Sequence, residues 1–329
     1  MRVHFVLPDD DQPSGGNVYD RRAIAGLAAL GLDVRDSAIA GTWPQPGEDA
    51  RGRLAGLLAA IPDHEVVLLD GLVACGVPDI VEAHTHRLRT AILVHLPLAA
   101  ETGLSPETAA RLDAAEKRAL RAARLVITTS PSTADELDHD HVRTALPGTE
   151  PAPVAPGTDG VTRLLCVASL TPRKGHDLLL EALADLPLTC DLVGPERDPD
   201  WARRLGEHRL GDRIRLRGPL TGAELADAYA AADLLVQPSR AETYGMAVTE
   251  ALARGIPVIA SAVPDALGDG GLLVPAGDLE SLTRALRRWA EDAAFRDRMR
   301  SAALRRRAHL PTWESTARQL AAALASLEV

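Results

Sequence analysis

The chain has 329 residues, of which 46% are hydrophobic and only 3% aromatic, and its formal net charge is −10 at pH 7. This length is sufficient for two domains with a core each, and the negative charge argues against a general nucleic-acid-binding or anionic-membrane surface. No apolar run reaches the roughly eighteen residues of a membrane-spanning helix.

The first residues and the cysteines indicate the cellular compartment in which the protein works. The chain starts with a strand-like run that ends in acids, unlike a secretory signal peptide. Cys75, Cys166 and Cys190 are scattered and lack the spacing of metal ligands. Two pairs of closely spaced histidines in the first half are more typical of solvated surface than of a metal site. We therefore expect a cytoplasmic protein with reduced thiols and no bound metal.

The first half alternates strand and helix patterns. Strand signals recur at 3–7, 65–69, 90–95 and 124–128, with helical runs at 18–30 and 106–122. This alternation predicts a parallel, doubly wound α/β sheet, in which ligands bind at the carboxyl ends of the strands. Asp70, Gly71 and His95 stand at such ends. A histidine there is also commonly a packed structural residue, so position alone leaves both roles open.

Gly15 and Gly16 lie between the first strand and the helical run that follows it. Paired glycines in such a loop allow a phosphate to approach the backbone closely, although most such pairs only turn the chain. The loop lacks the G-x-G-x-x-G pattern of dinucleotide-binding folds, which argues against a nicotinamide-dependent dehydrogenase.

A proline-rich stretch predicts the domain boundary. Residues 146–159 carry four prolines and two glycines without periodicity, as an interdomain linker does. The predicted organisation is a first domain at 1–150, a linker at 151–160, a second domain at 161–310 and a final helix at 311–329. The first 155 residues carry a net charge of −8 and the rest −2, so an anionic substrate is expected on the second half.

Arg173 and Lys174 precede a helical run in the second half, next to Gly175. Two cations beside a helix N-terminus are typical of a diphosphate site, although a solvated basic turn has the same pattern. Lysine is scarce here, since Lys117 is the only other one in the chain. In a chain that uses arginine almost everywhere else, a lysine here is consistent with a need for its compact ammonium.

Residues 239–255, SRAETYGMAVTEALARG, predict a loop that turns into a helix between two short strands. The free amides at the helix start, from Tyr244 through Gly245 and Met246 to Ala247, favour a phosphate. Glu250, about one turn into the helix, could accept hydrogen bonds from the vicinal hydroxyls of a ribose. Glu242, in the loop, could face another part of the ligand. An isolated pair of glutamates at this spacing also occurs as ordinary solvated residues.

The segment ADLLVQPSRAETYGMAVTEALARGIPVIAS resembles the signature of the retaining glycosyltransferases of family 4, which have the GT-B fold. The resemblance implies that Glu242 meets the transferred sugar, that Glu250 holds the ribose and that Lys174 binds the pyrophosphate. It also implies that His95 reaches the donor sugar near the scissile bond. Gly15 and Gly16 would face the donor phosphates and the acceptor, and Gly218 would lie against the nucleobase.

The resemblance implies two Rossmann-like domains that face each other across a cleft, with the last helix returning to the first domain. It implies transfer of a hexose from a nucleoside-diphosphate sugar to an acceptor hydroxyl, with retention and without metal or cofactor. Ser169 stands where the family commonly has an arginine, and Arg173 could supply that charge. A non-catalytic sugar-nucleotide-binding subunit, and an epimerase or phosphorylase of the same fold, remain alternatives. Donor, acceptor, oligomeric state and peripheral membrane contact stay open.

Overall fold

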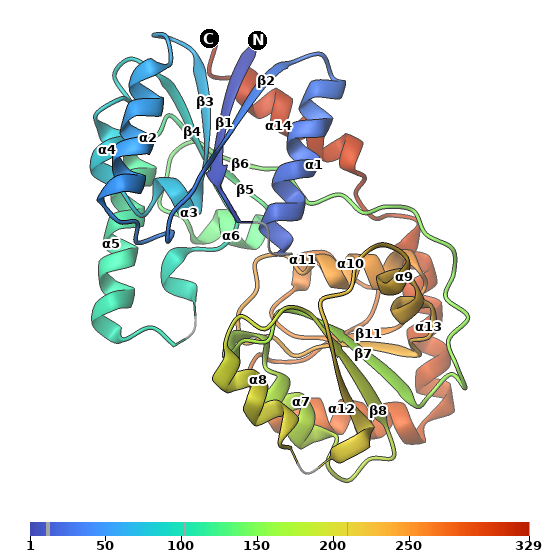
Figure 1. Ribbon diagram of the computed structural model, residues 1–329. Coiled ribbons are helices and arrows are strands. Elements are labelled where there is room, and N and C mark those ends of the chain that lie inside the picture. Colours follow the sequence, from blue (N-terminus) through green and yellow to red (C-terminus); the bar gives the residue numbers. More distant parts are fainter. Residues whose placement is uncertain (11–13, 102, 209, 329) are drawn as a thin grey trace. The chain divides into compact units, whose positions relative to one another are not determined.

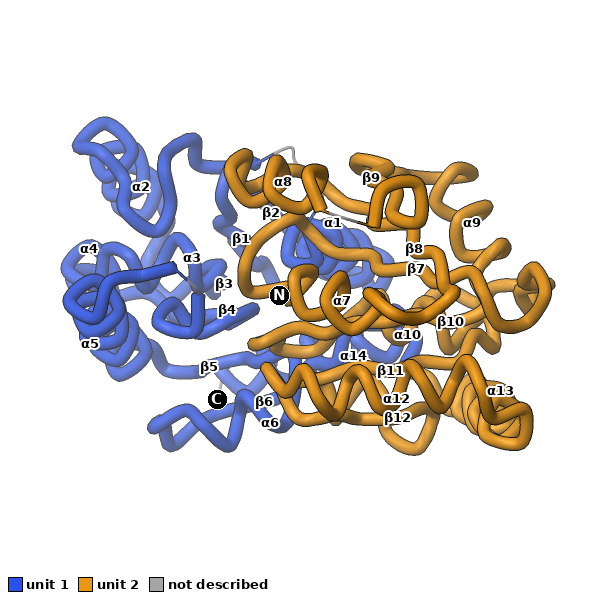
Figure 2. The backbone as a smooth tube through the Cα atoms, turned by 90° about the horizontal axis from the view of Figure 1, so that it is seen from below, with its two compact units in different colours: residues 1–148, 311–329 blue, residues 149–310 orange. Residues whose placement is uncertain are grey.

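The computed structural model describes residues 1–10, 14–101, 103–208 and 210–328. The chain divides into two compact units, Met1–Gly148 together with Pro311–Val329, and Thr149–Leu310 (Figure 2). Each unit has a parallel sheet with helices packed against it, so the predicted α/β class is confirmed. The division at residues 148 and 149 stands beside the boundary predicted at residue 150.

The first unit contains a sheet of six parallel strands in the order β2-β1-β3-β4-β5-β6. Its central strand β3 has the sequence VVLLD and is buried at every position, as expected of a parallel strand covered on both faces. The strands are β1 (Arg2–Pro8), β2 (Asp33–Ile39), β3 (Val66–Asp70), β4 (Arg89–Val94), β5 (Leu125–Thr128) and β6 (Val142–Thr144).

Helices cover both faces of this sheet (Figure 1). Leu68 and Leu69 are neighbours on β3 and belong to different hydrophobic clusters, because successive strand residues point to opposite faces. On one face α14 packs against α1, and a Cβ added at Gly26 would lie 2.7 Å from the Cβ of Ala317. The final helix therefore belongs to the first unit. The helices are α1 (Gly15–Ala29), α2 (Glu48–Ala60), α3 (Gly71–Ala74), α4 (Pro78–Glu82), α5 (Pro106–Ala122), α6 (Pro131–Glu136) and α14 (Trp313–Ala325), with a 3₁₀ turn at Leu98–Ala100.

The second unit also has six parallel strands, in the order β12-β11-β10-β7-β8-β9. Trp289 lies fully buried in its main hydrophobic cluster, and its indole N–H donates to the Val161 carbonyl at 2.8 Å. The strands are β7 (Arg163–Val167), β8 (Thr189–Val193), β9 (Ile214–Gly218), β10 (Leu234–Gln237), β11 (Val258–Ala260) and β12 (Leu272–Leu273). The helices are α7 (His176–Ala182), α8 (Pro199–Gly206), α9 (Gly222–Ala230), α10 (Met246–Ala253), α11 (Pro264–Leu267), α12 (Leu279–Glu291) and α13 (Ala293–Arg307), with 3₁₀ turns at Pro172–Lys174 and Gly211–Arg213.

The end of the predicted linker is held against the second unit by one buried carboxylate. Asp233 accepts hydrogen bonds from the backbone amides of Thr158 at 2.7 Å and of Gly160 and Arg163 at 3.0 Å. The amide of Gly157 also donates to the Ala230 carbonyl at 3.0 Å. The proline-rich composition indicates a connection, but it does not show that its last part is anchored.

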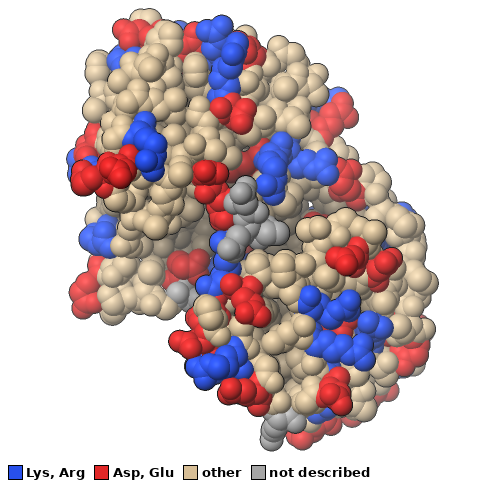
Figure 3. Space-filling view, viewed as in Figure 1, with Lys and Arg blue, Asp and Glu red and all other residues tan. Residues whose placement is uncertain are grey.

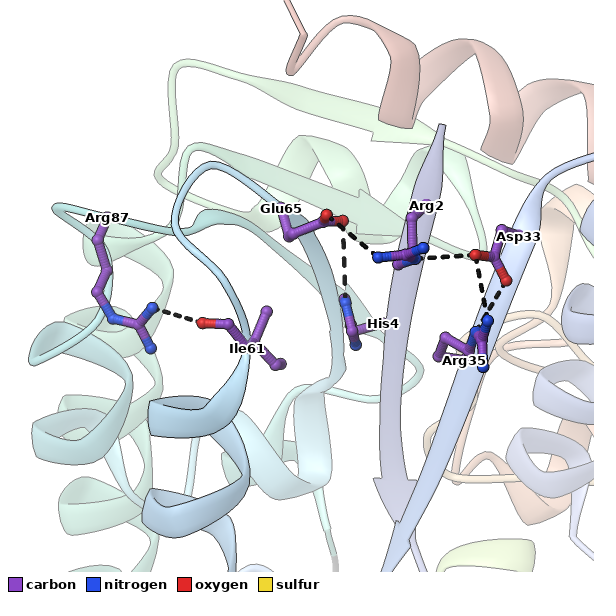
Figure 4. Close-up of polar contacts among 7 residues, drawn as sticks. All are labelled: Arg2, His4, Asp33, Arg35, Ile61, Glu65 and Arg87. Atoms are coloured by element: carbon purple, nitrogen blue, oxygen red, sulfur yellow. Dashed lines mark hydrogen bonds and ion pairs between the residues drawn. The ribbon is translucent and has the colours of Figure 1, made fainter.

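In the first unit, strands β2 and β6 were not predicted, and β2 shows the reason. It is an edge strand with mostly exposed residues, and charges on an edge strand hide the apolar pattern while they discourage pairing with another chain. Asp33 accepts from Arg2 and from Arg35, each at 2.8 Å, and Glu65 lies near Arg2 and His4 (Figure 4). These ion pairs lie at the amino ends of the strands, at the opposite edge from the predicted site.

The surface of the visible face is charged but mixed in sign. Acidic and basic side chains both occur on each unit (Figure 3). None of the helices among the described residues is long and apolar enough to cross a membrane. The three cysteines are buried and free.

Candidate active site

The loop after β10 leads into α10 through a glycine that the backbone requires. Gly245 has φ 94° and ψ 62°, a left-handed conformation, and a Cβ there would lie 2.6 Å from Cγ1 of Val263. This turn starts the helix at Met246, so that the amides of Met246 and Ala247 lie in its first turn, where they have no partner within the helix. Tyr244 is only 3% exposed, and its contribution to a phosphate site would therefore come from the backbone.

Lys174 and Glu242 are brought together in the second unit. The ammonium of Lys174 donates to Oε2 of Glu242, and a guanidinium nitrogen of Arg173 lies 3.7 Å from Oε1. The three side chains are 11–13% exposed. The sequence assigned the cations and the carboxylate to different parts of a ligand, with Glu242 free in its loop. The structure shows instead that they form one cluster.

The charge state of Glu242 follows from this cluster. Burial would raise the pKa of Glu242, but Lys174 and Arg173, together with hydrogen bonds from Lys174 and Ser239, lower it below its ordinary value. Glu242 is therefore an anion near neutral pH and a weak base.

Two residues that the sequence did not single out join the loops that carry this cluster. Arg240 donates to both carboxylate oxygens of Asp177, at 2.8 and 2.7 Å, a bidentate geometry. The amide of Arg240 donates to the Arg173 carbonyl at 2.8 Å. Gly175, at φ 69°, approaches the backbone of Pro238 so closely that a Cβ would lie 2.1 Å from its carbonyl oxygen. Nothing in the local pattern of Arg240 distinguishes it from a surface arginine.

Glu250 occupies a different environment on α10. Its Oε2 accepts a hydrogen bond from the hydroxyl of Tyr229 at 2.7 Å, and the Arg254 guanidinium lies 4.5 Å from the centroid of the Tyr229 ring. Burial raises the pKa of Glu250, against the opposing effects of Tyr229 and Arg254. Tyr229, fully buried on α9, was missed because a tyrosine in an apolar helix pattern is indistinguishable from a core residue.

Gly218 ends β9, at the edge of the second sheet. It has φ 68°, and a Cβ added there would meet no atom within 4 Å. Its carbonyl accepts from the Gly194 amide at 2.9 Å. The glycine is therefore required by its backbone conformation, and open space lies beside it.

In the first unit, the structure brings Gly16 and His95 together. Gly15 and Gly16 begin α1, and the hydroxyl of the N-cap residue Ser14 accepts from the Asn17 amide at 3.1 Å. A Cβ added at Gly16 would lie 3.4 Å from Cδ2 of His95, which follows β4. The absence of a side chain at Gly16 leaves room for the imidazole.

Two buried carboxylates flank His95. Its Nε2 lies 2.8 Å from Oδ1 of Asp20 and 3.4 Å from Oδ2 of Asp70. Asp70 was noted in the sequence as a strand-end residue, but Asp20, on α1, was missed because no local motif marks it. One oxygen or nitrogen atom from each of the three residues lies within 4.8 Å of the other two, a spacing at which side chains can bind a cation. The Nε2–Oδ1 distance is nevertheless that of a hydrogen bond.

Comparison with known proteins places the chain in a family. A family model described as "Glycosyl transferases group 1" matches residues 161–292. A D-inositol 3-phosphate glycosyltransferase of Nocardioides is 32% identical over 277 residues, which cover 71% of this chain and 60% of that protein. D-inositol 3-phosphate glycosyltransferase 1 of Catenulispora acidiphila is 30% identical over 321 residues, covering 83% and 75% respectively.

Solved structures agree on the fold. Sucrose-phosphate synthase of Thermosynechococcus elongatus superposes with a TM-score of 0.79 at 23% identity, covering 99% of both chains. Anabaena HepE, in a complex with UDP and glucose, has a TM-score of 0.76 at 18% identity and covers 99% of this chain and 100% of its own. The chain belongs to the group 1 glycosyltransferases and has the GT-B fold.

Proposed function

We propose that the protein is a retaining, metal-independent glycosyltransferase that moves a hexose from a nucleoside-diphosphate sugar to an acceptor hydroxyl. The observation that carries the proposal is the cluster of Lys174, Arg173 and Glu242, joined by Arg240 to the loop that opens α10. Such a cluster combines cations for a leaving diphosphate with an anion suited to sugar hydroxyls.

The departing diphosphate would be stabilised by the second unit. The ammonium of Lys174, the guanidinium of Arg173 and the first-turn amides of α10 are donors suited to an anionic leaving group. Preorganised donors of this kind stabilise developing charge without reorganising during the reaction. A metal ion is therefore not required for this role.

Glu250 would bind the two ribose hydroxyls. Tyr229 donates to Oε2 and fixes the orientation of the carboxylate, and none of the described residues donates to Oε1, so lone pairs on the carboxylate remain for the two hydroxyls. A carboxylate held in this way loses less conformational freedom when the nucleotide binds.

The transfer step would proceed on one face of the sugar. The bond between the anomeric carbon and the diphosphate oxygen breaks, and the bond to the acceptor oxygen forms on the same face. The acceptor proton passes to the departing phosphate oxygen. Glu242, whose pKa is lowered by its cations, would orient the sugar and not act as the base. His95 would contact the donor sugar near the scissile bond.

The relatives suggest which substrates to try first. HepE was crystallised with UDP-glucose, so UDP-glucose is the first donor, followed by other UDP- and GDP-hexoses. The curated relatives are named for inositol 3-phosphate, so this phosphorylated polyol is the first acceptor. The protein would work in the cytoplasm, where sugar nucleotides are available.

A thermal-shift panel tests the proposal. UDP, GDP, ADP, TDP and their sugar conjugates are compared with and without EDTA, because a ligand of the native state raises the unfolding midpoint. One nucleotide should stabilise the protein equally with and without EDTA. NMR of the product formed with that donor should then show the donor's anomeric configuration. Stabilisation that disappears with EDTA, or an inverted product, would contradict the proposal.

A further inference from the structure

The His95 ring is held from several sides in the first unit. Tyr19 packs against it edge-on, with ring centroids 5.2 Å apart and planes at 75°, and the Tyr19 hydroxyl is itself tied to the Ala145 carbonyl at 2.9 Å. The Gly16 backbone lies against Cδ2. The histidine side chain remains 20% exposed, so one part of a fixed ring is accessible.

The ring nitrogens of His95 are not equivalent. Within the described part of the chain, every hydrogen bond and ion pair of this ring is made by Nε2, to Asp20 and Asp70. An Nε2 that lies 2.8 Å from a carboxylate oxygen acts as a donor, because an ionised carboxylate can only accept. Nδ1 is the nitrogen left for a ligand.

Charge balance determines the protonation of the cluster. Asp20 is fully buried and Asp70 is 3% exposed, and two ionised carboxylates this close repel each other strongly. Oδ2 of Asp20 is buried and has no donor among the described residues if Asp70 is ionised. The side chains of Asp70 and Asp20 are within hydrogen-bond reach of each other, so a proton on Asp70 would supply a donor to the Asp20 carboxylate. Below about pH 7 the arrangement is then one cation, one anion and one neutral acid.

We propose that Asp20 is a positioning residue that holds His95 as an imidazolium, with Nε2–H on Asp20 and Nδ1–H directed to a substrate oxygen. His95 then donates a hydrogen bond and places a positive charge beside the substrate. Because both ring nitrogens carry a proton, it cannot act as a general base. This inference rests on the proposed function in one respect, namely that His95 meets the donor sugar. The contacts of Asp20 and His95 with each other do not depend on it.

The electrostatics of the surrounding groups agree with this assignment. Burial lowers the pKa of His95, but Asp20 and Asp70 outweigh it and raise the pKa to about 9. Burial and the charge of Asp20 raise the pKa of Asp70 to about 7. Tyr19, the other titratable group against the ring, stays neutral because burial and Asp20 raise its pKa. Since the folded-state pKa of His95 lies above its ordinary value, the imidazolium persists to about pH 8 and is lost toward pH 9 and above.

The test compares the wild type with Asp20→Asn, which keeps the shape of the side chain and removes its charge. Asp36→Asn, at an exposed position on β2, is the matched control, and His95→Gln assigns the NMR signal. Proton–carbon NMR of the histidine rings should show His95 of the wild type and of Asp36→Asn protonated to about pH 8. In Asp20→Asn the 2.8 Å pair is lost and Asp70, 3.4 Å from Nε2, remains as the nearby carboxylate, so the midpoint should fall by about one pH unit or more below that of the wild type.

The pH profile of transfer distinguishes positioning from a structural role. If the midpoint falls to about 6.5, about 3% of His95 is protonated at pH 8, so kcat of Asp20→Asn should fall roughly 30-fold there and less than twofold at pH 6. A midpoint held higher by Asp70 gives a smaller loss at pH 8, but the loss should still be larger at pH 8 than at pH 6. The KM for the donor should change little, and the wild-type kcat should be flat from about pH 6.5 to pH 8. An equal loss at every pH would overturn the proposal.

The NMR titration of His95 in the wild type tests the proposal even if Asp20→Asn does not fold. A His95 midpoint near 6.5 or lower in the wild type overturns it, and so does a shift of the His95 signal by stoichiometric Mn²⁺ or Zn²⁺ that EDTA reverses. The NMR measurement needs no substrate. If the titration behaves as expected and the wild type transfers no sugar, the Asp20–His95 pair stands and the proposed function fails.

Discussion

The ammonium of Lys174 donates a hydrogen bond to the carboxylate of Glu242, 68 residues further along the chain. Both groups are largely buried, so each determines the charge environment of the other. The cation proposed for the diphosphate and the anion proposed for the sugar are thus held in a single ion pair. The diphosphate and the sugar, which lie on the two sides of the bond that breaks, would be recognised by groups whose relative positions are already fixed.

Replacing Lys174 by Met should separate its two roles. Loss of the cation leaves Glu242 buried, with Arg173 as the remaining nearby cation, and breaking one side of a buried pair costs about 3–5 kcal/mol at most. We expect a lower unfolding midpoint in calorimetry and loss of the stabilisation by nucleoside diphosphate. Lys117→Met is the matched control, since the only other lysine forms an exposed pair with Asp113.

The double variant Lys174→Met/Glu242→Gln provides a second check. Removing both charges should recover part of the stability lost in Lys174→Met, because Glu242 no longer carries a buried negative charge, although Arg173 then loses its nearby carboxylate. Nucleotide stabilisation should not return. If Lys174→Met keeps the full thermal shift with every nucleotide, Lys174 does not bind the diphosphate.

Tyr229→Phe should weaken nucleotide binding without removing any proposed ligand contact. The hydroxyl that orients Glu250 through Oε2 is lost, and a hydrogen bond to a charged group contributes about 1.5–3 kcal/mol. Only the fraction of this free energy that preorganises the Glu250 carboxylate affects binding. We therefore expect the dissociation constant of the nucleotide, measured by calorimetric titration, to rise about 3- to 10-fold. Glu250→Gln should have a larger effect, and equal affinities for Tyr229→Phe and wild type would show that the orientation is unimportant.

Gly245→Ala should destabilise the second unit and impair the helix start. A non-glycine residue in a left-handed conformation costs about 1–2 kcal/mol, and the new Cβ would also collide with Val263. In the double variant Gly245→Ala/Val263→Ala, the stability lost to the steric collision should be recovered, whereas the cost of the left-handed backbone conformation should remain. Gly56→Ala, inside α2 with open space around the site, should instead stabilise by about 0.5–1 kcal/mol, as measured by urea unfolding.

Glu116 should make stability depend on pH. It is 5% exposed on α5 and accepts from the Leu98 amide at 3.1 Å, and burial raises its pKa from 4.5 to about 7. The folded state therefore binds the proton more tightly, and this group's contribution to stability falls as pH rises from about 4.5 to 7.

Glu116→Gln removes that dependence while keeping an acceptor for Leu98. The free energy of unfolding should exceed that of the wild type by about 1–3 kcal/mol at pH 8, at roughly 1.4 kcal/mol per pKa unit, and the difference should shrink below pH 5. Glu48→Gln, on α2 with a side chain that is 96% exposed, is the control and should show no such trend. A difference that is constant from pH 5 to pH 8 would contradict the expectation.

The sequence was sufficient for features determined by short-range spacing. The loop-to-helix turn at Gly245, the basic turn at Lys174 and the alternation of strands and helices are properties of neighbouring residues, and the α/β class followed from them. Helix α5, with a serine cap and a proline at its start, has the bounds that its periodicity predicted. Edge strand β2 was not predicted, because its exposed charged residues show no apolar pattern.

Tertiary structure decided which of these residues meet. Asp20 and His95 are 75 positions apart, Arg240 and Asp177 are 63 apart, and Tyr229 and Glu250 are 21 apart. These contacts depend on the order of the strands in each sheet and on the direction from which each helix returns to it. Local propensity and periodicity carry no information about either. The sequence by itself therefore determined the class of protein and the candidate residues, and packing determined their partners and charge states.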